Sequence, residues 1–192
     1  MQKDKKLNIT REKLVNAAME LMSECTDGSD VTSRAIAERA GVQLSMINYC
    51  FGSREALLYE AFSRNEKSYM EAAQIKGILC SELPPKEKLR RLHYTVAEFF
   101  VKEYRFTSAV MGYTLLHRDL SKEQSSLPLI TAHFGGRKTE LECKIIAYEL
   151  SSMMQLIIYR LNDFGSLSGM DLRDVHQLHK LIDMRIDMLL GE

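Results

Sequence analysis

The sequence predicts an all-α protein, and three observations support this. The 192-residue chain has only 3 prolines and 10 glycines, so few residues interrupt helices. Apolar residues recur three and four positions apart, whereas no long run alternates between apolar and polar residues as a half-buried strand does. A hydrophobic content of 45% and a charged content of 27% are typical of a globular protein with a solvated surface.

The first helix is expected to begin at Thr10, whose hydroxyl can cap free backbone N–H groups. Lys3, Lys5 and Lys6 would precede it as an arm, which either lies along DNA phosphates or is simply solvated. Residues 26–30, with the sequence TDGSD, are turn formers that should end the helix. The apolar stripe of this helix consists of Leu14, Ala17, Ala18, Leu21, Met22 and Cys25.

Residues 32–51, TSRAIAERAGVQLSMINYCF, have the spacing of a helix-turn-helix, a unit that binds DNA in most of its occurrences. Thr32 suits the N-cap of the first helix, and Gly41 suits the position after it, where φ is usually positive. Val42 and Ile47 are the apolar anchors of the second helix. The side chains left to face outward, and so to contact DNA bases, are Gln43, Leu44, Ser45, Met46, Asn48 and Tyr49.

A long helix is predicted from Arg54 to about Gln74, after a turn at Gly52 and with Ser53 as its N-cap. Free N–H groups, the positive end of the helix dipole and the Arg54 guanidinium converge at its start, which suits a phosphate. The alternative is that Arg54 forms a surface ion pair with a neighbouring glutamate.

Three segments follow one another within residues 10–58: TREKLVNAAMELM, VTSRAIAERAGV and INYCFGSREALL. Together they resemble the N-terminal DNA-binding domain of the TetR/AcrR family of bacterial transcriptional regulators. The resemblance implies a three-helix helix-turn-helix domain over residues 1–53, and a helical effector-binding and dimerisation domain over residues 54–192. The departures from the family pattern are Leu44, Met46, Asn48 and Cys50.

Double-stranded DNA is the partner that this resemblance implies. A cation at the position of Arg54 touches the DNA backbone in the family, which favours the phosphate contact over the ion pair. The residues expected to contact DNA are Thr32, Ser33, Gln43, Leu44, Ser45, Met46, Asn48, Tyr49 and Arg54.

Further helices are predicted beyond Gly77. They cover residues 85–102, residues 106–116, a short stretch between Asp119 and Phe134, residues 137–162, and a last stretch from Asp171. Between Ile145 and Tyr159 the helix is apolar nearly all round, with Glu149 as its only charge. Such a helix is buried on two sides, which a monomer of this size rarely provides.

The last two long helices resemble the four-helix dimer interface of the TetR family, so a homodimer is expected. The interface residues expected from this resemblance are Tyr148, Ser152, Leu156, Ile157, Val175, Leu178, Ile182 and Ile186.

The resemblance also implies a small-molecule effector bound among the helices after the DNA-binding domain. Aromatic and methionine side chains there suit a lipophilic or aromatic molecule, although the same side chains are also ordinary core residues. The expected lining consists of Phe62, Tyr69, Phe99, Phe100, Met111, Tyr113, His117, Phe134 and Met153. Candidates to orient the effector are His117, His133, Glu149 and Gln155.

No enzyme, metal or cofactor site is expected. The chain contains no phosphate-binding G-x-x-x-x-G-K-S/T, no G-x-S-x-G and no H-E-x-x-H motif. His176 and His179 could share a metal, but no third ligand lies near them in sequence. Cys50 is either a small buried hydrophobe or a thiol that switches DNA affinity on oxidation.

The remaining features fit a cytoplasmic protein. The four cysteines form no C-x-x-C pair, no signal peptide is visible, and no apolar run is long enough to cross a membrane. The formal net charge of +0 gives little support to DNA binding, so that prediction depends on the motif.

The function expected is that of a ligand-responsive repressor, which binds a palindromic operator as a dimer and is released by its effector. The alternative is a helical module that binds a small molecule or a protein and whose helix-turn-helix no longer recognises DNA. Its near-neutral charge and the apolar Leu44 and Met46 would fit that alternative.

Overall fold

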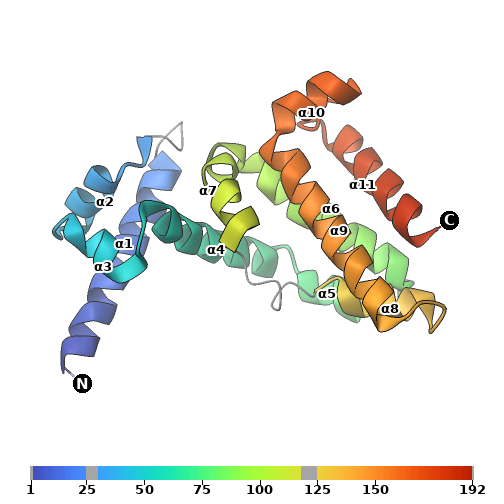
Figure 1. The fold of residues 1–192 in the computed structure, drawn as a ribbon, viewed down its shortest axis with the longest axis horizontal. Helices are drawn as coiled ribbons and strands as arrows, with labels where there is room; N and C mark the ends of the chain where they lie inside the picture. Colours follow the sequence, from blue (N-terminus) through green and yellow to red (C-terminus); the bar gives the residue numbers. More distant parts are fainter. Residues whose placement is uncertain (1, 25–29, 118–124, 192) are drawn as a thin grey trace. The chain divides into compact units, whose positions relative to one another are not determined.

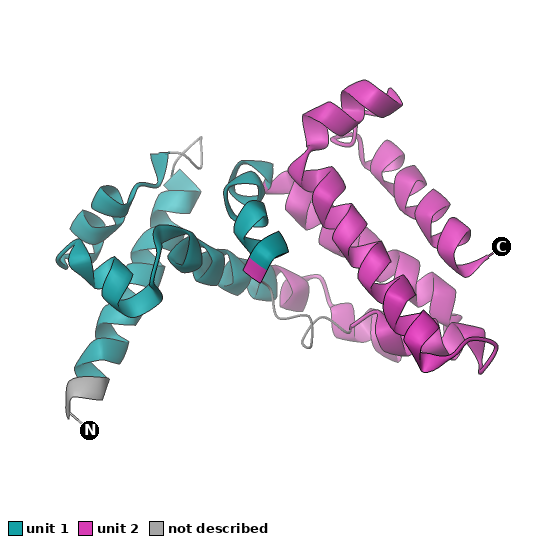
Figure 2. Ribbon diagram, viewed as in Figure 1, with its two compact units in different colours: residues 1–68, 104–116 teal, residues 69–103, 117–192 magenta. Residues whose placement is uncertain are grey.

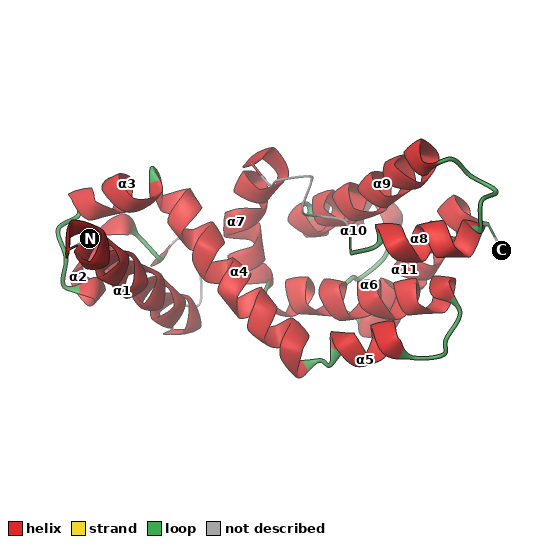
Figure 3. Ribbon diagram, turned by 90° about the horizontal axis from the view of Figure 1, so that it is seen from below, coloured by secondary structure: helices red, strands yellow, loops and turns green. Residues whose placement is uncertain are grey.

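The computed structural model describes residues 2–24, 30–117 and 125–191, and over these ranges the chain forms eleven α-helices and no strand (Figure 1 and Figure 3). The predicted all-α fold class is therefore confirmed. The helices are α1 (Gln2–Glu24), α2 (Ser33–Ala40), α3 (Ser45–Phe51), α4 (Arg54–Ala72), α5 (Ile75–Cys80), α6 (Pro85–Lys102), α7 (Tyr104–His117), α8 (Leu127–Phe134), α9 (Glu140–Tyr159), α10 (Leu161–Ser168) and α11 (Val175–Leu190). Cys25 of the expected apolar stripe, residues 26–29 of the expected turn, and residues 119–124 at the start of the expected short helix lie outside the described ranges. Among the helices of those ranges, none combines the length and the apolar character needed to span a membrane.

The chain divides into two compact units (Figure 2). Unit 1 comprises Met1–Ser68 and Tyr104–Leu116, and unit 2 comprises Tyr69–Glu103 and His117–Glu192. The division falls within α4, and most of α4 and α7 belongs to the same unit as the helix-turn-helix. The boundary expected between residues 53 and 54 therefore differs from this division, and as a functional boundary it stays a prediction.

Apolar side chains of α1, α2, α3, α4 and α7 form the core of unit 1. Its largest fully buried side chains are Leu14, Ile36, Ile47, Leu57, Leu58 and Met111. The rings of Tyr59 on α4 and Tyr113 on α7 lie 5.6 Å apart between centroids, which joins α7 to the same core.

Helix α1 begins earlier than predicted. Thr10 does not cap it, because the helix already includes Gln2 and the Thr10 hydroxyl donates to the carbonyl of Lys6 at 3.1 Å. No proline or glycine stands between Gln2 and Thr10, so nothing in the sequence stops the helix there. The three N-terminal lysines are thus part of α1 and not of an arm before it.

Unit 2 has a core between α6, α8, α9 and α11. Its largest fully buried side chains are Leu89, Phe99, Ile130, Leu150, Ile158 and Leu172. Helix α9 starts at Glu140 because Thr139 and Glu142 form a capping box, in which each side chain accepts a hydrogen bond from the backbone N–H of the other. Helix α11 starts four residues later than predicted, with Asp174 as its N-cap.

Four residues expected in a dimer interface belong instead to this core: Ile157, Leu178, Ile182 and Ile186 are at most 6% exposed within the single chain. For the three residues of α11, the physical reason is that α6 of the same chain packs on this helix, whereas Ile157 lies on α9, which packs on α6 and α8. The other four, Tyr148, Ser152, Leu156 and Val175, keep part of their surface accessible.

Polar side chains line the contact between α6 and α11. Asp183 accepts a hydrogen bond of 2.5 Å from the Tyr94 hydroxyl, and its Oδ1 lies 3.2 Å from Arg90 Nε. One turn away, Glu98 Oε1 lies 2.5 Å from His179 Nε2, and the His179 ring stacks on Tyr94 with 3.8 Å between centroids. These pairs fix how α11 lies against α6, in addition to the apolar core.

Candidate nucleic-acid interface

The turn between α2 and α3 has the geometry that the sequence predicts. The Thr32 hydroxyl accepts from the backbone N–H of Ala35 at 3.2 Å, which caps α2. Gly41 adopts a φ of +64°, and the N–H of Val42 donates to the carbonyl of Ala37 at 3.0 Å. This is the hydrogen bond of a Schellman ending, so the chain stops α2 within one residue and enters α3.

Helix α3 is anchored by one fully buried side chain. Ile47 is 1% exposed in the core of unit 1, whereas Val42, the other expected anchor, is only partly buried. We use the name recognition surface for the side chains predicted to face outward: Gln43, Leu44, Ser45, Met46, Asn48 and Tyr49. All of these are exposed except Met46, which is partly buried, and Tyr49 is the most exposed of the apolar side chains among them at 63%.

The N-terminal end of α2 adds two hydroxyl groups on the same helix-turn-helix. Thr32 is exposed and Ser33 is partly exposed. A helix N-terminus with hydroxyl side chains suits contact with a phosphate, as expected for both residues.

Arg54 is held by the protein more firmly than predicted. Its Nε donates to the carbonyl of Val31 at 2.7 Å, and its Nη1 lies 3.4 Å from a carboxylate oxygen of Glu55. The ion pair weighed as the alternative is therefore present. The guanidinium ties the start of α4 to the segment that enters α2, while Ser53 caps α4 by accepting from the N–H of Ala56 at 3.0 Å. A phosphate contact by Arg54 stays a prediction.

Ion pairs that the sequence analysis missed surround the far end of α3. Arg11 of α1 donates to the carbonyl of Cys50 and to the carboxylate of Glu60 on α4. Arg64 joins the same group by binding Glu12 at 2.7 and 2.9 Å and Glu60 at 2.9 Å. Only the spacing of Glu60 and Arg64, four apart on one helix, is a local signal for this network.

Cys50 lies in the same region and is half-buried. Burial raises the pKa of its thiol, and the nearby Arg11 charge offsets only part of this. Because the thiolate is the reactive form, this environment favours the packed hydrophobe over the redox switch.

The residues expected to line an effector pocket are distributed over both units. In unit 1, Phe62 and Met111 are buried. In unit 2, the ring of Tyr69 lies 4.8 Å from that of Phe99 between centroids, whereas His117 is exposed. The remaining residues of the set are the half-buried Tyr113 in unit 1, the buried Phe100 and Phe134 in unit 2, and the exposed Met153 in unit 2.

Neither unit therefore contains the whole set, and the pocket stays a prediction. Unit 1 has a shallow apolar crevice, partly open to solvent, that is too narrow to hold a water molecule. None of the expected residues lines it. Its lining consists of Met22, Val31, Leu58, Phe106, Ala109 and Val110.

Two histidines of unit 2, His133 and His179, have structural partners. His179 pairs with Glu98, and His133 Nε2 lies 3.1 Å from the carbonyl of Leu190. Within the described ranges, no group of three or more histidine, cysteine or acidic side chains is arranged to hold a metal ion. His176, which was weighed as a metal partner of His179, is exposed at the start of α11.

Unit 1 thus presents a capped helix-turn-helix with an exposed second helix, an arrangement typical of DNA-binding proteins. No protein-family model matches the chain, and no curated protein matches it significantly. Solved structures do match. A TetR transcriptional regulator from Rhodococcus sp. RHA1 aligns with a TM-score of 0.59 at 16% identity, covering 97% of this chain and 97% of its own. A TetR-like transcriptional regulator from the same organism aligns with a TM-score of 0.55 at 19% identity, covering 95% of this chain and 97% of its own. The chain therefore has the fold of TetR transcriptional regulators.

Proposed function

We propose that the chain is a transcriptional regulator that binds double-stranded DNA by placing α3 in the major groove. The observation that carries this proposal is the arrangement of the turn and α3: Ile47 holds the helix in the core, while five of the six side chains of the recognition surface are exposed and Met46 is partly exposed. A helix of this kind, next to a capped partner helix, fits the groove of B-DNA.

The chemistry of the recognition surface supports contact with base edges. Gln43 and Asn48 carry amides, which can donate to and accept from the major-groove edge of adenine, and Ser45 can donate or accept. The exposed phenol of Tyr49 can donate to a phosphate oxygen. Leu44 is 51% exposed and can contact the methyl group of a thymine.

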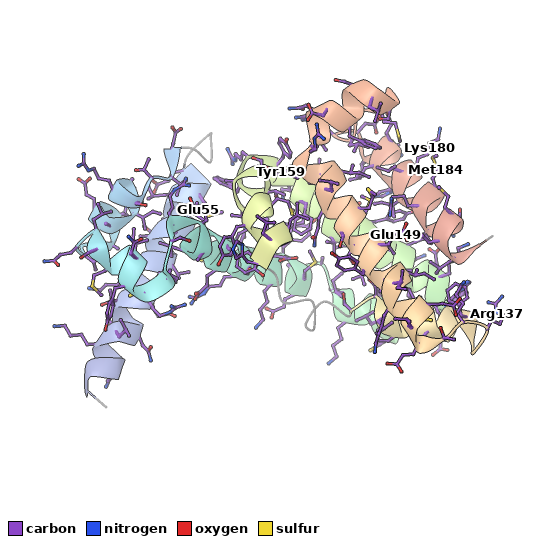
Figure 4. All side chains as sticks on the ribbon, in the orientation of Figure 1. Glu55, Arg137, Glu149, Tyr159, Lys180 and Met184 are labelled. Carbon is purple, nitrogen blue, oxygen red and sulfur yellow. The ribbon has the colours of Figure 1, made fainter. Side chains whose placement is uncertain are left out.

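The proposed assembly is a homodimer on a palindromic operator. Helix α9 presents accessible apolar side chains three and four residues apart on either side of Ser152, which we call the α9 face: Leu141, Ile145, Tyr148, Leu156 and Tyr159. Each of them is at least 42% exposed in the single chain. Exposed apolar side chains gathered on one helix favour a partner, and a second copy would set two α3 helices at a fixed separation. Figure 4 shows Tyr159 and Glu149 on α9 and Met184 and Lys180 on α11.

Release of DNA by a small lipophilic effector completes the proposal. Its support is the aromatic content of unit 2, including the Tyr69 and Phe99 ring pair, and the likeness in fold to TetR regulators. A repressor that the effector displaces from DNA in the cytoplasm is the simplest form of such a regulator.

A mobility-shift experiment with duplex DNA flanking the chain's own gene tests the proposal. We expect a salt-sensitive complex, with log K falling linearly in log salt because bound phosphates release counterions. A shuffled duplex of the same composition is the control. Equal affinity for both duplexes at about 150 mM salt would contradict operator recognition.

A second candidate function is that of a helical binding module whose helix-turn-helix contacts a protein. The accessible Leu44 and the formal net charge of +0 favour it. The same mobility shift separates the two, since this module would bind neither duplex.

A further inference from the structure

We infer that Arg11 is a positioning residue of the recognition helix: it fixes the C-terminal end of α3 and acts on DNA binding only through α3. The part of this inference that concerns DNA affinity rests on the proposed DNA-binding function. Its structural part, the control of α3 by Arg11, is independent of that function and can be measured without DNA.

Helix α3 needs such support because little else holds it. It has seven residues, Leu44 at its N-cap makes no side-chain capping bond, and Ile47 is its one buried side chain. A helix this short is not stable by itself, and its last carbonyl groups have no partner within the helix. Apolar burial at Ile47 alone would leave the end near Phe51 free to pivot.

Arg11 supplies the missing anchor at that end. One branch of its guanidinium donates to the carbonyl of Cys50, and the guanidinium carbon lies 4.2 Å from the centroid of the Phe51 ring. A positive charge at a helix C-terminus is favourable because it faces the negative end of the helix dipole. The planar fork of arginine donates to the carbonyl and to a carboxylate from two separate nitrogens in fixed geometry, whereas lysine would have to reach both acceptors from one nitrogen.

The other branch of the guanidinium is held in place from α4. It donates to Glu60, whose second oxygen accepts from Arg64 at 2.9 Å. Arg64 in turn binds Glu12, the neighbour of Arg11 on α1, at 2.7 and 2.9 Å. The four side chains close a ring between α1 and α4, so the orientation of Arg11 is set independently of α3.

The consequence for recognition follows from sequence distance. Asn48 and Tyr49 of the recognition surface directly precede Cys50, whose carbonyl Arg11 binds. Loosening this end of α3 therefore displaces both side chains together. Base contacts require side chains held within fractions of an ångström, so DNA affinity should fall even though Arg11 loses no contact with DNA.

Hydrogen exchange of the full-length protein without DNA tests the structural part. In Arg11→Met, which keeps an apolar stem but removes the fork, we expect amides of residues 45–51 to exchange about tenfold faster, because a hydrogen bond to a charged group contributes in that range. The matched control is Arg39→Met. The side chain of Arg39 is 36% exposed, against 35% for that of Arg11. Arg39 also binds a glutamate of α1, Glu24 at 2.7 and 2.9 Å, but these bonds connect it to α1 and not to α3. Unchanged α3 exchange in Arg11→Met, or equal acceleration in Arg39→Met, would overturn the inference.

Arg11→Lys provides the conservative variant and carries the test if Arg11→Met does not fold. Its ammonium keeps the charge but must reach Cys50 and Glu60 from one nitrogen without the fixed geometry of the fork, so α3 exchange should be intermediate between wild type and Arg11→Met. Exchange in Arg11→Lys identical to wild type would contradict the role of the fork.

The DNA arm uses a duplex selected by the wild-type protein from a random-sequence library. Arg11→Met should bind it about tenfold more weakly, with the slope of log K against log salt unchanged, because no phosphate contact is lost. A slope reduced by about one would show that Arg11 touches a phosphate directly and would overturn the inference. If no duplex is selected, the proposed function fails, while the exchange experiment still decides whether Arg11 positions α3.

Discussion

His93 of α6 and Ser126, the residue before α8, are joined by a hydrogen bond of 3.1 Å between Nε2 and Oγ. Burial, together with the smaller effect of the nearby Arg185 charge, lowers the pKa of His93 from its usual 6.5 to about 4. Arg185 is itself partly buried, and burial lowers its pKa as well. The unfolded chain therefore takes up a proton at a pH where the folded chain keeps His93 neutral.

The first prediction is that this histidine makes unit 2 acid-sensitive. Its contribution to stability is complete above pH 6.5 and is lost as the pH falls from 6.5 towards 4, because only the unfolded state is protonated in that window. A pKa shift of this size corresponds to a loss of at most about 3 kcal/mol in the free energy of unfolding. The actual loss should be smaller, because the side chain keeps some solvent contact. Urea unfolding of His93→Gln should show a flatter loss of stability over this window than wild type. His176→Gln, at an exposed position of α11, is the control and should follow the wild-type curve.

The second prediction concerns the junction of α4 and α5. Among the residues that the structure describes, Gln74 is the one non-glycine residue with a positive φ, at +55°. A side chain in this left-handed conformation costs about 1 kcal/mol, which glycine avoids. Gln74→Gly should therefore raise the urea midpoint. Ala73→Gly, one residue earlier, should lower it, since its backbone is not strained and glycine only adds freedom to the unfolded chain. A lower midpoint in both variants would contradict the strain at Gln74.

The third prediction separates affinity from sequence preference at the recognition surface. Tyr49→Ala should weaken binding to all duplexes by a similar factor, because a phosphate contact carries no sequence information. Gln43→Ala should instead change which base pairs are preferred, by about 1–3 kcal/mol at one position. Binding curves for a panel of singly substituted operators would distinguish the two patterns. Arg54→Ala is a weaker test than the sequence indicated, because it also removes the hydrogen bond to Val31.

The fourth prediction is that the α9 face forms the dimer contact. Leu156→Glu places a charge where the proposed partner would bury it, so light scattering should give the mass of the 22.0 kDa monomer instead of twice that mass. Leu167→Glu on α10, where the leucine is 84% exposed, is the control and should leave the mass unchanged. A wild-type protein that is monomeric at micromolar concentration would rule out this assembly.

The success and failure of the sequence analysis have a common physical origin. The capped helix-turn-helix was predictable because Thr32 and Gly41 act on backbone groups within a few residues of themselves. The bond from Arg11 to Cys50 and the pairing of Tyr94 with Asp183 join residues 39 and 89 positions apart, and no local pattern specifies them.

The expected interface residues that are buried within the single chain show a related limit of sequence patterns. Apolar periodicity shows that one face of a helix is buried, but it does not show whether the same chain or a second chain covers it. For Ile182 and its neighbours on α11, the cover is α6 of the same chain.

The last prediction is that α4 transmits effector binding to DNA affinity. A ligand can lower DNA affinity only if it binds the DNA-incompetent arrangement of the two recognition helices more tightly than the competent one. In the competent arrangement the two helices must match half-sites that lie one helical turn of DNA, about 34–36 Å, or a multiple of it apart. Helix α4 begins in unit 1 and its last residues, from Tyr69, belong to unit 2, so it connects the two units covalently. Two of the expected pocket residues, Phe62 and Tyr69, lie on α4. Phe62 is 4% exposed, so Phe62→Ala would cost about 3–5 kcal/mol of stability and obscure any specific effect.

Tyr69→Ala is the sharper variant for this prediction, because its partly buried ring pairs with Phe99 and does not fill the core. The measured quantity is the factor by which a lipophilic ligand, found by thermal shift, weakens operator binding. We expect Tyr69→Ala to reduce this factor more than it reduces operator affinity in the absence of ligand. Lys67→Ala, at an exposed position two residues earlier on α4, should leave this factor unchanged. An unchanged factor in Tyr69→Ala, with ligand binding itself retained, would mean that the signal reaches α3 by a route other than this helix. The thermal shift of Tyr69→Ala with the ligand shows whether the variant still binds it. If binding is lost, Tyr69 belongs to the binding site and not to the connection between the units.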